Sequence, residues 1–435
     1  MNSRQPLLSE RDKPVVERYL AFAHEHFEAA SGPGEGVSVA GADLVYQYRA
    51  IIRVLAHHVR GVRLPVGVCQ KLCSQALSRW LRTGGVTVAD YAKALEGVFA
   101  EYRRRHLSKF LLVYLFDGEE MPGAEQGNLH FLDVSFSTPT WRELGSNLEV
   151  DRWLQDAGLH VHDMDAIRRT RPLVAHARGR LPIEAFAAPD EAFAGYVALV
   201  NFALDLGRTH YQIRGCSAPV PPSPIHGTFD ETGHFLFTRY AIFEGERRRP
   251  HGQADPKTRD WIACVMLEYA RRPTSNSTAR LWFDALLRYG GALHEASVDG
   301  ELLMYWQAVE ALTLFLPGEA TAHEVARRMA VLLGDEFIVE ENVQALGAAR
   351  NAIVHFQRGD HVGHDYEFGS LRDSADALKL LVERGLRMLR HRGTELRTIR
   401  DLALFYGMGR EHCSQLKARQ RVAKYIERTR DQAKA

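Results

Sequence analysis

The sequence predicts an α+β protein that is mostly α, with a mixed helix and strand region followed by a helical bundle. Two observations favour this fold class. Apolar side chains recur every three to four residues over most of the chain, and a few short runs rich in β-branched and aromatic residues lie in its first part. The length of 435 residues allows about three domains. We expect residues 1–250 to form the mixed region as one or two subdomains, residues 257–395 the bundle, and residues 396–435 a basic helical tail.

The first region begins with helices and then changes to the alternating pattern of strands. A loop rich in glycine is expected at residues 30–42, and a proline-rich linker at residues 215–227. The expected helices are 14–29, 43–59, 66–82, 88–105 and 186–207. The expected strands are 109–116, 129–136 and 235–243.

From residue 257 the periodicity predicts helices almost without interruption. Ser277 has the side chain of an N-cap, and the last helix of the bundle carries a one-sided apolar stripe that includes Leu378 and Val382. The tail has more basic than acidic residues after residue 410, which predicts a solvated helix face or an arm that contacts RNA. The expected helices are 258–271, 277–296, 299–316, 320–334, 340–356 and 369–391.

Charge, hydropathy and cysteine usage limit the class of protein. The net charge of +1 argues against a protein that coats nucleic acid broadly, although it leaves room for a local basic groove. No apolar run has the length of a membrane span, and the N-terminus lacks the apolar core of a secretory signal. The 5 cysteines are odd in number and scattered, which suits a reducing compartment. We therefore expect a cytoplasmic protein that does not associate with a membrane.

The segment Arg350-Asn-Ala-Ile-Val-His355 places an arginine, an amide and a histidine near the end of an expected helix. Asn351 and His355 are four residues apart and share one face of that helix, and Arg350 lies at its edge. An arginine can hold a phosphate with its planar fork, and a histidine can exchange protons near neutral pH. The residues expected on the opposite, core-facing side are Leu346, Ala349 and Ile353.

The segment that contains this signature, about residues 257–392, resembles the HEPN superfamily, and more closely its Apea-like HEPN domains. The resemblance rests on the apolar helix Leu302–Leu312 with Glu310 inside it, on the helix expected at 320–334, and on the Arg-x4-His signature of Arg350 and His355. It implies an endoribonuclease that needs no metal and no cofactor. It also implies a homodimer or higher oligomer in which two signatures form one composite site, and a role in antiviral defence or abortive infection with an unknown trigger.

The resemblance also implies a role for each side chain. The 2′-hydroxyl of single-stranded RNA attacks the adjacent phosphate and leaves a 2′,3′-cyclic phosphate. His355 would transfer a proton, Arg350 would hold the phosphate, and Asn351 would orient either group. Glu310 is expected to pair with Arg350, either to aim its guanidinium or only to tie two helices together. The loop residues Arg358, His361 and His364 could contact RNA or form a solvated loop.

Other functions and sites compete with this interpretation. The segment Arg171-Pro-Leu-Val-Ala-His176 has the same spacing, but Pro172 stands where a polar residue is favoured. The segment His160–Asp165 does not complete a metal-binding motif, so no metal ligands are expected. A HEPN-like bundle could also be a non-catalytic scaffold that binds RNA or protein, or the toxin of a toxin–antitoxin pair.

Overall fold

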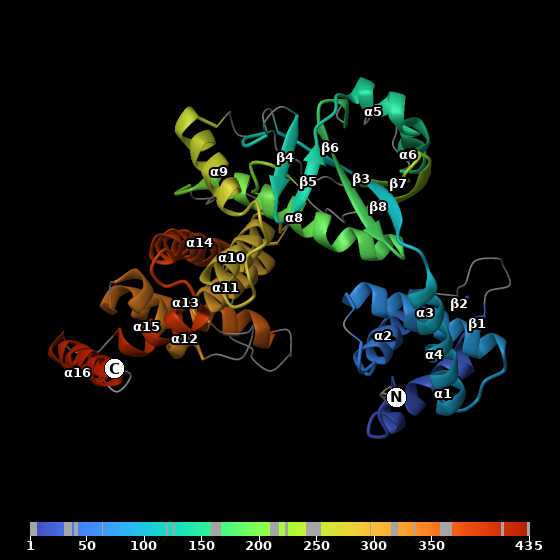
Figure 1. Cartoon of the computed structure of the whole chain (residues 1–435), viewed down its shortest axis with the longest axis horizontal. Helices are drawn as coiled ribbons and strands as arrows, with labels where there is room; N and C mark the ends of the chain where they lie inside the picture. Colours follow the sequence, from blue (N-terminus) through green and yellow to red (C-terminus); the bar gives the residue numbers. More distant parts are fainter. Residues whose placement is uncertain are drawn as a thin grey trace. The chain divides into compact units, whose positions relative to one another are not determined.

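The computed structural model has the α+β, mostly α fold that the sequence predicts (Figure 1). It divides into two compact units, which are described separately. The first comprises Met1–Leu112, His176–Pro189 and Phe229–His234, and the second comprises Val113–Ala175, Asp190–Thr228 and Phe235–Ala435. The structure describes residues 7–29, 37–38, 42–62, 64–118, 121–124, 127–157, 167–208, 217–221, 225–240, 254–295, 297–314, 321–334, 336–356, 368–409 and 413–432. Residues 250–253 of the expected boundary near 250–257 lie outside these residues.

The first unit is built on four helices that the sequence predicts within a few residues of their ends. They are α1 (Lys13–His26), α2 (Ala42–His57), α3 (Val66–Arg82) and α4 (Val88–Arg104), with two short strands, β1 (Glu28–Ala29) and β2 (Val37–Ser38). Their apolar faces form one core around buried Leu77 and Trp80. Thr87 and Asp90 form a capping box that fixes the start of α4. Cys73 is buried in this core and Cys69 is half-buried.

A six-stranded sheet follows, with the strand order β4-β5-β6-β3-β7-β8. β4 pairs with β5 and β5 with β6 in antiparallel register. Two short helices, α5 (Trp141–Asn147) and α6 (Val150–Asp156), lie between β5 and β6 along the chain, and the long helix α8 (Pro182–Asp205) follows β6. The strands are β3 (Ser108–Phe116), β4 (Asn128–Phe131), β5 (Val134–Ser137), β6 (Arg171–Gly179), β7 (Ile225–Asp230) and β8 (Phe235–Tyr240).

The structure corrects two expectations in this region. The strand expected at 129–136 is a hairpin of β4 and β5, because Leu132 and Asp133 take left-handed backbone angles, φ 51° and 64°. Neither residue is the glycine or asparagine that normally signals such a turn. Backbone bonds from both residues to Tyr269 and Ala270 stabilise it. β7 begins inside the expected linker at 215–227, and β6 was not predicted.

The middle of α8 packs on the sheet through aromatic and charged side chains, those of Asp190 and Phe193. Tyr114 of β3 stacks on Phe193 with ring centroids 4.7 Å apart. Its hydroxyl donates to Asp190, 2.6 Å away, and Arg239 of β8 donates to the same carboxylate at 2.7 Å. Burial lowers the pKa of neighbouring His226 to about 4, so the ring is neutral at neutral pH.

The C-terminal helices form the bundle that the sequence predicts. Ser277 caps α10 by accepting a bond from the backbone N–H of Arg280, as expected. α10 packs on α11, α11 on α14, and α12 on α13. The expected helical tail forms two helices. In order the helices are α9 (Pro256–Glu268), α10 (Thr278–Leu293), α11 (Val298–Leu312), α12 (Ala322–Leu333), α13 (Glu336–Phe356), α14 (Phe368–Arg392), α15 (Ile399–Met408) and α16 (Cys413–Gln432). Among the described helices, none has both the length and the apolar character needed to cross a bilayer.

Candidate functional site

The helix α13 holds the signature on its exposed side. Leu346, Ala349 and Ile353 are buried, as the periodicity predicts, whereas Asn351 is exposed and Arg350 is partly exposed. His355 lies in the last turn of the same helix, and the structure describes its backbone only. The expected loop contacts Arg358, His361 and His364 lie outside the described residues, as does the segment His160–Asp165.

Arg350 and Asn351 are joined by a hydrogen bond from Arg350 Nη1 to Asn351 Oδ1, 2.8 Å long. Because this bond occupies the amide oxygen, the amide NH₂ of Asn351 is left to donate outward. The remaining guanidinium N–H groups are also donors. The pair therefore presents hydrogen-bond donors and one positive charge at an exposed helix face, a combination suited to phosphate oxygens.

Glu310 forms a hydrogen bond with a partner that was not predicted from the sequence. Its side chain is 1% exposed, and its Oε1 accepts a hydrogen bond of 3.0 Å from the indole N–H of Trp306, one turn earlier on α11. The predicted pair with Arg350 is not one of the contacts found at either residue. The spacing of four residues between Trp306 and Glu310 is the signal that could have indicated this bond.

Trp306 in turn contacts the signature helix at Gly347. A Cβ placed on Gly347 would lie 2.9 Å from the Trp306 ring and 2.4 Å from the Cβ of Ala322 on α12. Only a glycine permits this close approach of α13 to α11 and α12. Because Gly347 precedes Arg350 and Asn351 by about one turn, the bond from Trp306 to Glu310 helps to set where the signature side chains project.

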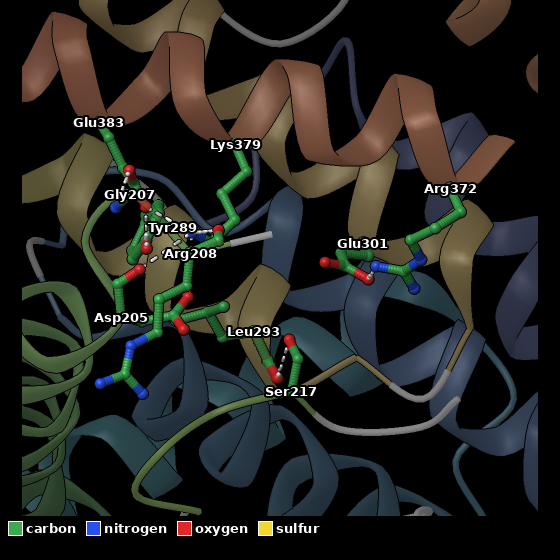
Figure 2. A network of polar contacts seen from close by, with 10 residues as sticks. All are labelled: Asp205, Gly207, Arg208, Ser217, Tyr289, Leu293, Glu301, Arg372, Lys379 and Glu383. Carbon is green, nitrogen blue, oxygen red and sulfur yellow. Dashed lines mark hydrogen bonds and ion pairs between the residues drawn. The ribbon is translucent and has the colours of Figure 1, made fainter. Parts of the chain in front are cut away.

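A network of buried charges lies where α14 faces α10 and the turn after α8 (Figure 2). The ammonium group of Lys379 is 0% exposed and contacts Glu383 Oε1 at 2.6 Å and Asp205 Oδ2 at 3.1 Å. It also donates to the backbone carbonyl of Arg208 at 2.7 Å. Glu383 accepts further bonds from the Tyr289 hydroxyl and the backbone N–H of Gly207. These contacts hold the turn after α8 against α10 and α14.

A second buried ion pair joins the start of α14 to α11. Arg372 Nη1 lies 2.7 Å from Glu301 Oε2, and both side chains are 2% exposed (Figure 2). The apolar stripe of α14 was predicted from the sequence, but the charged residues beside it were not. The signal was present, because Arg372, Asp376, Lys379 and Glu383 recur every three to four residues and lie on one side of the helix.

The decoy segment Arg171–His176 forms part of β6, with both end residues exposed. Residues five positions apart lie much farther from each other in an extended strand than in a helix. This segment therefore lacks the geometry of the signature. Among the described residues, no group of three or more histidine, cysteine, aspartate or glutamate side chains is placed to hold a metal ion.

Comparisons with known proteins gave no relative for this chain. No protein-family model matches it, and neither a curated protein nor a solved structure matches it. The resemblance to HEPN domains thus stays a prediction that depends on the residues of α11 and α13.

Proposed function

We propose that this protein is a metal-independent endoribonuclease of HEPN type that cleaves single-stranded RNA at Arg350, Asn351 and His355. The observation that carries the proposal is the outward-facing donor pair of Arg350 and Asn351 on α13, one turn before His355 on a helix held at Gly347. Exposed donors at fixed spacing suit a polyanion that is too large to be enclosed in a pocket.

In the proposed reaction the nucleophile belongs to the substrate. The 2′-oxygen forms a bond to the neighbouring phosphorus, and the bond from that phosphorus to the 5′-oxygen of the next nucleotide breaks. A base removes the 2′-hydroxyl proton and an acid protonates the departing 5′-oxygen. His355 carries out one of these proton transfers, and in a composite site the partner subunit's His355 carries out the other. Arg350 stabilises the charge that develops on the phosphate oxygens.

The proposed site is shared between two subunits, as the resemblance implies. An exposed signature on one protomer leaves one wall of the substrate site to be supplied by another copy. Such a site is idle whenever the two copies are apart or wrongly arranged, and a small change in their arrangement can switch it. We infer a role in antiviral defence, where an RNase must stay idle until it is triggered.

The proposal is tested by cleavage of a labelled single-stranded RNA in EDTA. Wild type should produce fragments with 2′,3′-cyclic phosphate and 5′-hydroxyl ends. The same strand made with 2′-deoxy sugars should not be cleaved, because it lacks the nucleophile. His355→Ala should lower the rate by about 100-fold or more, because it removes a proton-transfer group. The matched control is His176→Ala, which removes the exposed histidine of the decoy segment and should cleave at the wild-type rate.

Two outcomes would contradict the proposal. Equal cleavage by wild type and His355→Ala would assign the activity to another site or to a contaminant. Binding of RNA by both proteins with cleavage by neither would instead support a non-catalytic scaffold.

A further inference from the structure

A pocket on the opposite end of α14 from the Arg372–Glu301 pair has a lining that the proposed nuclease site does not use. Its volume is about 790 Å³, within the range of small-molecule sites. α9, the segment that joins it to α10, the first turn of α10 and the last turns of α14 form its walls. All of these belong to the second unit, and none of the pocket residues belongs to α13.

The charge of the pocket is strongly positive. Its basic side chains are Arg271, Arg272, Arg387, Arg390 and His391, against one carboxylate, Glu268. Glu268 is paired with Arg390 at 2.8 Å, and Arg272 is paired with Glu191 at 2.6 Å. Arg271 and Arg387 are exposed, and within the described part of the chain neither forms an ion pair with a carboxylate. Two guanidinium groups are thus available to an anion.

Aromatic rings form the other part of the lining. Trp261 is half-buried. The guanidinium carbon of Arg390 lies 5.2 Å from its ring centroid, and the ring centroid of Phe202 lies 5.8 Å from it. A stacked arginine and indole offer flat faces to a third planar group. Tyr269 and Trp282, with centroids 5.1 Å apart, continue the apolar wall. This wall suits a planar ring better than a simple inorganic ion.

The first turn of α10 adds to the anionic preference. Ser277, Thr278 and Ala279 line the pocket, so the positive end of the helix dipole faces it. A helix start alone would not define a site, but here it lies in the same pocket as two available arginines and a half-buried indole. Positive charge, flat apolar faces and this volume are together suited to a nucleotide, whose phosphates are anionic and whose base is planar.

We propose that this pocket binds a small nucleotide, with its base against Trp261 and Arg390 and its phosphates on Arg271 and Arg387. The site is distinct from the signature on α13 and does not depend on the nuclease proposal. Its ligand is a nucleoside mono-, di- or triphosphate, because a longer strand would extend beyond a pocket of this volume.

The first test measures binding of ATP, GTP, CTP and UTP to the full chain by calorimetry. At least one should bind with a Kd well below about 1 mM, and the corresponding nucleoside and inorganic phosphate should each bind at least about tenfold more weakly. The double variant R271A/R387A should weaken binding by about tenfold or more. The control Arg142→Ala removes an exposed arginine of α5 outside the pocket and should bind as wild type does.

A second comparison tests the aromatic half of the proposal. Trp261→Leu should weaken nucleotide binding by about tenfold, whereas Trp261→Phe should restore most of it. Inorganic phosphate should bind equally to the wild type and both variants. Far-UV circular dichroism checks that each variant is folded.

Several results would overturn the inference. The inference is wrong if none of the four nucleotides binds, or if R271A/R387A binds nucleotide as tightly as wild type does. It is also wrong if phosphate alone binds as tightly as the nucleotide. Binding of a ten-nucleotide RNA through the same arginines, without binding of mononucleotides, would mark a strand-binding surface instead. His355→Ala should bind nucleotide normally, so failure of this inference is separable from failure of the proposed nuclease.

Discussion

At the scale of single residues, Lys379 shows how a charge can be held inside an apolar bundle. Its ammonium group is enclosed by two carboxylates and by backbone carbonyls, among them that of Arg208. Burial and the neighbouring Glu383 raise the pKa of Tyr289 well above its ordinary value, so the hydroxyl remains a donor to that carboxylate. The cost of removing these charges from water is offset only while every partner is present.

Lys379→Met should therefore be strongly destabilising. The methionine fills a similar volume but leaves Asp205 and Glu383 buried without their cation. We expect the free energy of unfolding to fall by about 3–5 kcal/mol, measured by urea denaturation. Lys257→Met, at an exposed position on α9, is the matched control and should change it by less than about 0.5 kcal/mol. A small effect at Lys379 would mean that the network is solvated.

Glu310 and Trp306 show that a buried carboxylate can act through another side chain. The indole N–H holds one oxygen of Glu310, and the ring of Trp306 contacts the backbone of α13 at Gly347. In the proposed nuclease, Glu310 would therefore act as a positioning residue through Trp306 and not as the direct partner of Arg350. Arg350 was correctly expected at the edge of the exposed face, because that depends only on helical periodicity.

At the scale of elements, the close packing of α13 against α12 depends on the absence of a side chain at Gly347. An alanine normally favours a helix by about 1 kcal/mol over glycine. Here its methyl group would overlap the Cβ of Ala322 and the ring of Trp306. The Cβ of Ala322 is fixed to the backbone of α12, and the ring of Trp306 is buried and bonded to Glu310.

Gly347→Ala should therefore destabilise the protein by about 1–3 kcal/mol, because the overlap outweighs the gain in helix propensity. It should also reduce RNA cleavage if the signature works as proposed, since Arg350 and Asn351 follow on the same helix. Thermal unfolding and the cleavage assay measure the two effects.

Gly407 of α15 provides the matched control for this change. A Cβ at Gly407 meets no atom within 4 Å, so Gly407→Ala should be neutral or stabilising by up to about 1 kcal/mol. The same effect at both positions would show that α13 adjusts freely and that Gly347 does not fix it.

At the scale of the whole molecule, two half-buried histidines couple stability to pH. Burial lowers the pKa of His226 and of His294 to about 4 each, from an ordinary value of 6.5. His294 Nε2 lies 3.3 Å from the carbonyl oxygen of Val220, and it can donate to that oxygen when the ring is neutral and protonated at Nε2. As the pH falls below about 6.5, the unfolded chain binds protons that the folded chain does not.

Stability should consequently fall between pH 6.5 and pH 4, and these groups have no effect above that range. Each histidine contributes about 1.4 kcal/mol for each pH unit in this window. Urea denaturation of wild type and His294→Gln at pH 7.5 and 5.0 should show a loss smaller by about 2 kcal/mol in the variant. Equal losses in both proteins would mean that His294 is accessible to protons when folded.

The sequence by itself determined the fold class, most helices, the cap at Ser277 and the burial of Leu346, Ala349 and Ile353. These follow from periodicity and capping, which act between residues a few positions apart. Only the tertiary structure decided that Trp306 bonds to Glu310, that Lys379 is buried, that residues 129–136 form a hairpin, and that arginines from α14 and from the segment after α9 share one pocket. These depend on contacts between segments far apart in the chain, and local periodicity carries no information about them.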